Sequence, residues 1–98
     1  LATASHGVVL RLAGNLEGSR QLALRNALEQ VALARAPIEI DMHLLDDLDA
    51  HACGLLLLLH AWQRDIGQPL SLRGVSRPVQ KRLAHHGAEF LLTPVPLA

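Results

Sequence analysis

One stretch decides the fold: Ile38–Leu59, with the sequence IEIDMHLLDDLDAHACGLLLLL. Apolar and acidic residues alternate over its first five positions, Ile38–Met42, which predicts a strand. Acidic residues then precede a run of five leucines, and this pattern predicts a helix from about Cys53 to Ile66. A strand that leads into a helix is the repeating unit of an α/β fold.

The sequence on both sides of this stretch continues the alternation of strands and helices. We expect a strand from Val8 that turns at Ala13–Asn15, an amphipathic helix over Ser19–Arg35, a strand over Pro69–Gly74, a helix capped by Ser76 and closed by Gly87, and a short helix or strand over Glu89–Leu92. Crossover connections of this length predict a sheet that helices cover on at least one face.

Composition excludes several classes of function. Half of the 98 residues are hydrophobic, which is enough for one core. Nine basic residues balance nine acidic ones, and there is one Trp, one Phe and no Tyr, so we expect no nucleic-acid partner. Cys53 is the only cysteine, which favours a cytoplasmic location. The longest apolar run, Leu55–Leu59, is far shorter than the roughly 20 residues of a membrane-spanning helix, so the domain is not expected to be membrane-embedded.

The leucine run predicts a contact surface. Successive helical residues are rotated by about 100°, so five leucines cannot all face one sheet. The sector predicted to face the core holds Leu55, Leu59, Trp62 and Ile66, with Leu58 beside it. The side predicted to bind a partner holds Leu56, Leu57, His60 and Arg64.

The order and spacing of several residues resemble the STAS domain family, which includes the bacterial anti-sigma factor antagonists. The similar positions are Ile38–Asp41, Asp49, Gly67, Leu72, Gly74, Ser76, Val79 and Gly87, together with the first-strand segment Val9–Leu16. The resemblance covers nearly the whole chain. It implies a single domain over residues 1–98, with a central mixed sheet of four or five strands flanked by about three to four helices. Residues 1–6 would be loosely ordered or part of a trimmed first strand.

The resemblance also implies a function in signal transduction. In partner-switching members the loop before the second helix reads Asp-Ser-Ser-Gly, and a kinase that is also an anti-sigma factor phosphorylates the second serine. The corresponding residues here are Asp49, Ala50, His51 and Ala52, so His51 occupies the phosphorylation position and serine phosphorylation is impossible. We expect a non-enzymatic module without a cofactor that still binds an anti-sigma factor or kinase-like protein. The expected contact residues are Asp49, Ala50, His51, Ala52, Cys53, Leu56, Leu57, His60, Arg64 and Arg77.

A second resemblance leaves another partner open. The segment Leu70–Ser76, LSLRGVS, is also similar to the small STAS subunit of phospholipid-transporting ABC systems. That subunit binds the ATPase subunit of its transporter. An accessory role in a lipid-transporting ABC complex is therefore the alternative.

Two chemical alternatives start from the same turn. Asp49, His51 and Cys53 lie at a helix start, where the helix dipole favours a thiolate nucleophile, but no residue is evidently placed to form an oxyanion hole. The aspartates at 46, 47 and 49 could hold a hard cation. Such residues more usually lie in a solvated loop, where their negative charge stabilises the N-terminus of the helix that follows. The spacing of the histidines suits no shared metal ion. We therefore expect neither a catalytic residue nor a metal site.

Overall fold

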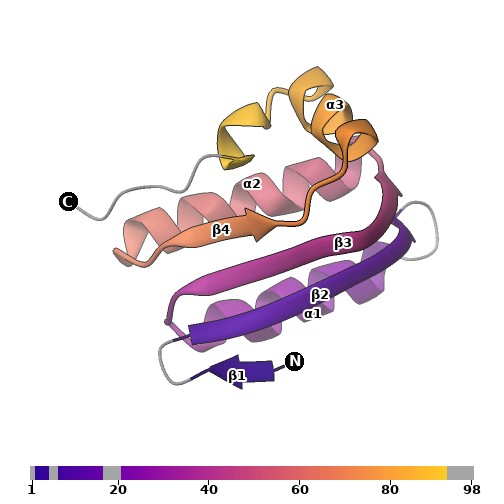
Figure 1. Ribbon diagram of the computed structural model, residues 1–98. Helices are drawn as coiled ribbons and strands as arrows, with labels where there is room; N and C mark the ends of the chain where they lie inside the picture. Colours follow the sequence, from indigo (N-terminus) through magenta and orange to yellow (C-terminus); the bar gives the residue numbers. More distant parts are fainter. Residues whose placement is uncertain (1, 5–6, 17–20, 93–98) are drawn as a thin grey trace.

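The computed structural model describes residues 2–4, 7–16 and 21–92 (Figure 1). Of residues 1–6, those at 2–4 form a strand, and the others lie outside the described residues. The elements in chain order are β1 (Ala2–Ala4), β2 (Gly7–Leu16), α1 (Gln21–Leu33), β3 (Ile38–Leu48), α2 (Ala50–Asp65), β4 (Leu70–Arg73), α3 (Arg77–His85) and the 3-10 helix η2 (Glu89–Leu92).

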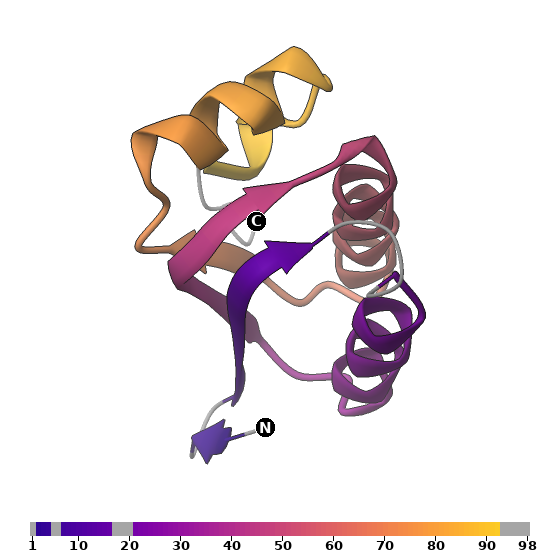
Figure 2. The same ribbon diagram turned by 90° about the vertical axis from the view of Figure 1, so that its right-hand side faces the viewer.

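The strands form one sheet within the described residues, in the order β1-β2-β3-β4. Strands β2, β3 and β4 are parallel, and the short β1 pairs antiparallel with β2 at the edge. The helices α1 and α2 form the two crossovers, and both cover the same face of the sheet (Figure 2). The predicted α/β class is confirmed. No described helix lies across the opposite face of β2, β3 and β4 (Figures 1 and 2).

The core lies between the sheet and the helices. Ile38, Ile40 and Met42 of β3 are buried under the helical layer, because every second side chain of a strand points to the same face. Val79 and Leu83 of α3 are fully buried as well. Figure 1 shows α3 next to the end of β3, and η2 above β4. The core thus extends from the helix–sheet interface to α3.

Strand β2 is longer than predicted. The expected turn at residues 13–15 is wrong, because the strand continues to Leu16. Gly14 has a φ of 76°, which glycine adopts without strain, and the pairing with β3 shifts register between Arg11 and Ala13 and again between Gly14 and Asn15. At each shift β3 contributes one extra residue, as in a β-bulge. These bulges allow both strands to continue past the glycine.

The predicted junction between β3 and α2 was also displaced. Strand β3 continues through the acidic residues to Leu48, and α2 begins at Ala50 instead of Cys53. The carboxylate of Asp49 caps the helix, which satisfies a backbone N–H that has no partner within the helix. The strand and the helix are therefore separated by a single residue.

Candidate functional site

The first turn of α2 is tied to two other elements through Asp49. Its Oδ1 accepts a hydrogen bond from the Ala52 amide at 2.9 Å, and its Oδ2 accepts one from Nε2 of Gln21 in α1 at 3.3 Å. The amide of Asp49 donates to the carbonyl of Leu16 at 3.2 Å. Because β2, α1 and α2 meet at this residue, the turn has a defined orientation.

A second aspartate joins the end of β3 to α3. Oδ1 and Oδ2 of Asp47 accept hydrogen bonds from Nε and a terminal nitrogen of Arg82, at 3.1 and 3.2 Å. The hydrogen bond from Arg82 is the largest of the effects that hold the pKa of Asp47 below its ordinary value. Arg82 thus attaches α3 beside the start of α2, whereas the predicted contact residue Arg77 is exposed at the first position of α3.

The structure divides the predicted contact residues by burial. Ala50, His51, Arg64 and Arg77 are exposed, and Asp49, Leu57 and His60 are half-buried. Ala52, Cys53 and Leu56 are buried in the core. These three cannot touch a partner directly, so their predicted place on the surface is wrong.

The predicted orientation of α2 was wrong because five consecutive leucines do not identify a buried face. The residues of α2 that face the core are Ala52, Cys53, Leu56, Leu59 and Gln63. Gln63 is buried although it is polar, since its Nε2 donates to the carbonyls of Ala36 at 2.9 Å and Pro69 at 3.2 Å. Leu58 and Trp62, which were predicted to lie at the core, have exposed fractions of 69% and 41%.

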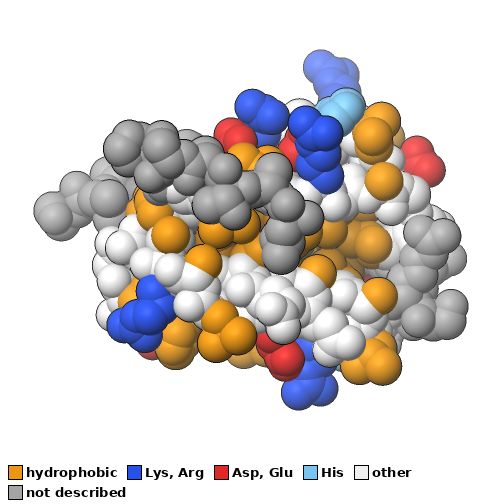
Figure 3. Space-filling model, turned by 90° about the horizontal axis from the view of Figure 1, so that it is seen from below, with side chains coloured by type: hydrophobic (Ala, Val, Ile, Leu, Met, Phe, Trp, Pro, Cys, Tyr) orange, Lys and Arg blue, Asp and Glu red, His pale blue; other side chains and the backbone are white. Residues whose placement is uncertain are grey.

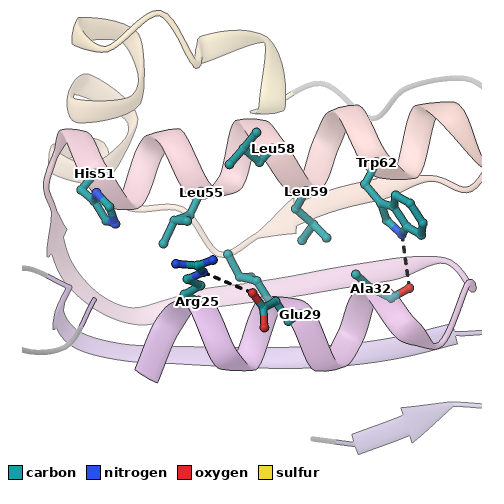
Figure 4. Close-up of a pocket in the computed structure, with 9 residues that line it drawn as sticks. Arg25, Glu29, Ala32, His51, Leu55, Leu58, Leu59 and Trp62 are labelled. Carbon is teal, nitrogen blue, oxygen red and sulfur yellow. Dashed lines mark hydrogen bonds and ion pairs between the residues drawn. The ribbon is translucent and has the colours of Figure 1, made fainter. Parts of the chain in front are cut away.

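A groove runs between α1 and α2, with a volume of about 500 Å³. Figure 4 shows side chains of α2 lining it from one side and side chains of α1 from the other. The lining residues are Arg25, Leu28, Glu29, Ala32, His51, Leu55, Leu58, Leu59 and Trp62. Sequence reasoning missed this groove, although the positions 51, 55, 58 and 62 have the spacing of one helix face.

Two contacts help to determine the shape of the groove. The indole Nε1 of Trp62 donates to the carbonyl of Ala32 at 3.3 Å, which holds the ring across the two helices. On α1, Nε of Arg25 donates to Oε1 of Glu29 at 3.2 Å. The groove is therefore apolar along most of its length and carries charged and imidazole groups at its margin (Figure 4).

The opposite side of α2 faces η2. The rings of His60 and Phe90 meet edge to face, with centroids 4.9 Å apart, and Phe90 is half exposed. Leu57 packs against the core from this side. Two strips of α2 are thus accessible, one along the groove and one beside η2.

The geometry argues against a cysteine nucleophile. Cys53 is 1% exposed, and burial, followed by the negative charge of Asp49, raises the pKa of its thiol. His51, two residues before Cys53 in the first turn of α2, is exposed. A buried thiol with a raised pKa is a poor nucleophile, because the thiolate is the reactive form.

Two of the three aspartates make contacts within the protein. Within the described residues, no group of three or more His, Cys, Asp or Glu side chains is arranged to hold a metal ion. Asp47 pairs with Arg82, and Asp49 caps α2. Their carboxylates serve the structure of the turn.

The comparisons identify the family. No helix in the described part of the chain has the length and apolar character needed to cross a membrane. No curated protein is significantly similar to the chain. A family model described as "Mlab, STAS domain" matches residues 1–93, which is nearly the whole chain. The chain therefore belongs to the STAS domain family.

Proposed function

We propose that this STAS domain is a non-enzymatic interaction module that binds a protein partner through the first turn of α2, residues 49–54, and the exposed side of that helix. The observation that carries the proposal is the exposure of Leu58 and Trp62 beside an apolar groove. Contiguous exposed apolar surface with a polar margin is typical of a protein-interaction site.

The proposed contact residues would take part in the contact in different ways. Ala50, His51, Leu58 and Trp62 would touch the partner at the turn and along the groove, and Leu57, His60 and Arg64 would extend the contact on the side of η2. Ala52, Cys53 and Leu56 would act indirectly, because they anchor the helix in the core. Arg77, at the start of α3, would lie at the border of the contact area.

The favoured partner class is a cytoplasmic anti-sigma factor or kinase-like protein, as for the bacterial anti-sigma factor antagonists that the sequence resembles. In that class the partner dissociates when a serine of the turn is phosphorylated. His51 stands at this position and Ala50 precedes it, so neither residue has a hydroxyl group. Binding would therefore be constitutive, or regulated at another site, within a transcription-regulating partner switch.

A second candidate is an accessory subunit of a lipid-transporting ABC complex. It is supported by the match to a Mlab-type STAS model and by the segment Leu70–Ser76, which resembles the transporter subunit. The partner would then be the ATPase subunit. Both candidates use the same surface of α2 and differ in the protein that binds there.

Affinity capture from a lysate of the source organism, followed by mass spectrometry, tests the proposal. We expect the wild-type chain to retain one partner that Leu58→Asp loses, because burying a carboxylate in an apolar contact removes its hydration at a large cost in free energy. An anti-sigma factor or kinase-like protein supports the first candidate, and an ABC ATPase supports the second.

The matched control is Leu44→Asp. Leu44 is a leucine of similar exposure, 58%, but it lies on β3 away from the groove. Cooperative thermal unfolding with equal midpoint temperatures shows that both variants are folded. Retention of the partner by Leu58→Asp would overturn the proposed surface.

A further inference from the structure

A charged cluster lies on the face of the sheet that the described helices leave open. Arg11 of β2, Asp41 of β3 and Arg73 of β4 are direct register partners, so they form one row across three strands. Glu39 is two residues before Asp41 on the same face, and His43 is two residues after it. Figure 3 shows basic, acidic and histidine side chains together along its upper rim, the side of the open face.

Both arginines contact the same oxygen. Nε of Arg11 lies 3.5 Å from Oδ2 of Asp41, and a terminal nitrogen of Arg73 lies 3.6 Å from that oxygen. The two guanidinium nitrogens are therefore no more than about 7 Å apart. The other oxygen, Oδ1, accepts hydrogen bonds from Nδ1 of His43 at 2.6 Å and from the His43 amide at 3.1 Å.

The three side chains differ in burial. Asp41 is 4% exposed, whereas the side chains of Arg11 and Arg73 are 73% and 59% exposed. Asp41 is therefore covered by its contacts with the two arginines and His43, while both guanidinium groups stay at the surface. The buried carboxylate holds the two guanidinium groups side by side.

Much of the hydrogen-bonding capacity of the arginines is directed at solvent. A guanidinium group has five N–H donors. Within the described part of the chain, the ion pair of Arg11 uses only Nε and leaves its terminal nitrogens accessible. The distances of 3.5 and 3.6 Å to Asp41 are longer than the 2.7–2.9 Å of a strong charge-assisted hydrogen bond. A ligand oxyanion can therefore bind without displacing a strong internal contact.

We propose that Arg11 and Arg73 form a clamp for a carboxylate side chain of an acidic segment of a protein partner. The two oxygens of a carboxylate can each accept a hydrogen bond from one guanidinium group at this separation. A monoanionic carboxylate suits the clamp better than a phosphate dianion, because the negative charge of Asp41 lies directly below. This surface is on the opposite side of the sheet from α1 and α2, so it is additional to the docking site on α2.

Glu39 provides an internal check on the clamp. Its Oε2 lies 3.6 Å from a terminal nitrogen of Arg73, so it competes with a ligand for that guanidinium group. Glu39→Gln removes the competing charge and keeps the shape of the side chain. The clamp therefore predicts tighter binding of a carboxylate when Glu39 is replaced by Gln.

The test is an NMR titration of the ¹⁵N-labelled chain with acetyl-tetraglutamate amide at low salt. We expect saturable shifts of the Arg11 and Arg73 Nε–H signals, and none with the tetraglutamine peptide. Arg11→Gln should weaken binding by about twofold to fivefold, the scale of one exposed charge pair. Glu39→Gln should tighten it by a similar factor.

The matched control is Lys81→Gln, which removes an exposed cation on α3 and should leave the binding unchanged. Equal weakening by Lys81→Gln and Arg11→Gln would mean that binding depends only on net charge, and it would overturn the clamp. Weaker binding by Glu39→Gln would also overturn it. Tighter binding of inorganic phosphate than of the glutamate peptide would contradict the carboxylate assignment. None of these outcomes depends on partner capture by α2.

Discussion

Three aspartates of this chain have different roles because their neighbours differ. Asp41 is buried beneath two arginines on the open face of the sheet, Asp47 pairs with Arg82 of α3, and Asp49 caps α2. The sequence alone suggested a role at the helix start for Asp49 and grouped Asp47 with it as a loop residue. The individual role of each carboxylate depends on side chains that lie far away in the chain.

At the residue scale, we predict that Asp41 and Asp47 make stability depend on pH in the acidic range. The pKa of Asp41 is lowered chiefly by the hydrogen bond from His43, and that of Asp47 chiefly by the hydrogen bond from Arg82. Because the folded-state pKa is below the unfolded value of about 3.9, the stabilisation is present above that pH and is lost as the pH falls through the folded-state pKa.

Urea unfolding between about pH 5 and pH 3 measures this effect. The free energy of unfolding should decrease as the pH falls in the wild-type chain, and it should decrease less steeply in Asp41→Asn. Identical slopes for the two proteins would show that the contact between His43 and Asp41 contributes nothing to the pH dependence.

A second prediction at this scale concerns the thiol. Cys53 is buried and its pKa is raised, so iodoacetamide should alkylate it far more slowly in the folded chain than in urea-unfolded chain. Mass spectrometry over time measures both rates. Rapid alkylation of the folded protein would contradict the burial of Cys53 and would support its role as a nucleophile.

At the scale of the element, the orientation of α2 has a measurable consequence. Leu56 is fully buried and Leu58 is exposed, the reverse of the face predicted from the leucine run. Leu56→Ala should therefore lower the free energy of unfolding by roughly 2–5 kcal/mol, the range for a cavity in a packed core. Leu58→Ala should change it by less than about 0.5 kcal/mol, as is usual for a surface position. Urea denaturation of both variants decides between the two orientations.

The same scale explains which boundaries could be predicted. The cap of α3 at Ser76 was predicted correctly, because the signal is local: its side chain accepts from the Val79 amide, and Pro78 lies in the first turn. The turn expected at residues 13–15 was wrong, because strand β2 is continued by its pairing with β3, which is remote in sequence. Local capping signals are visible in a sequence, whereas a pairing partner is not.

At the scale of the whole molecule, the two faces of the sheet present different chemistry. One face is covered by α1 and α2, whose outer surface carries the apolar groove. The described helices leave the other face uncovered, and it carries the charged row of Arg11, Asp41 and Arg73. Since the sheet separates the two surfaces, Leu58→Asp and Arg11→Gln should act independently on partner capture and glutamate binding.

The sequence by itself determined the α/β class, the order of the main elements and the resemblance to STAS domains, because hydrophobic periodicity, capping residues and glycine spacing are local properties. It also determined that the turn of α2 contains no serine. Only the tertiary structure decided which side of α2 is buried, because a helix with five consecutive leucines acquires a face only when it packs against β3 and α1. The same holds for Arg11, Asp41 and Arg73, which are far apart in the chain and become neighbours through strand register.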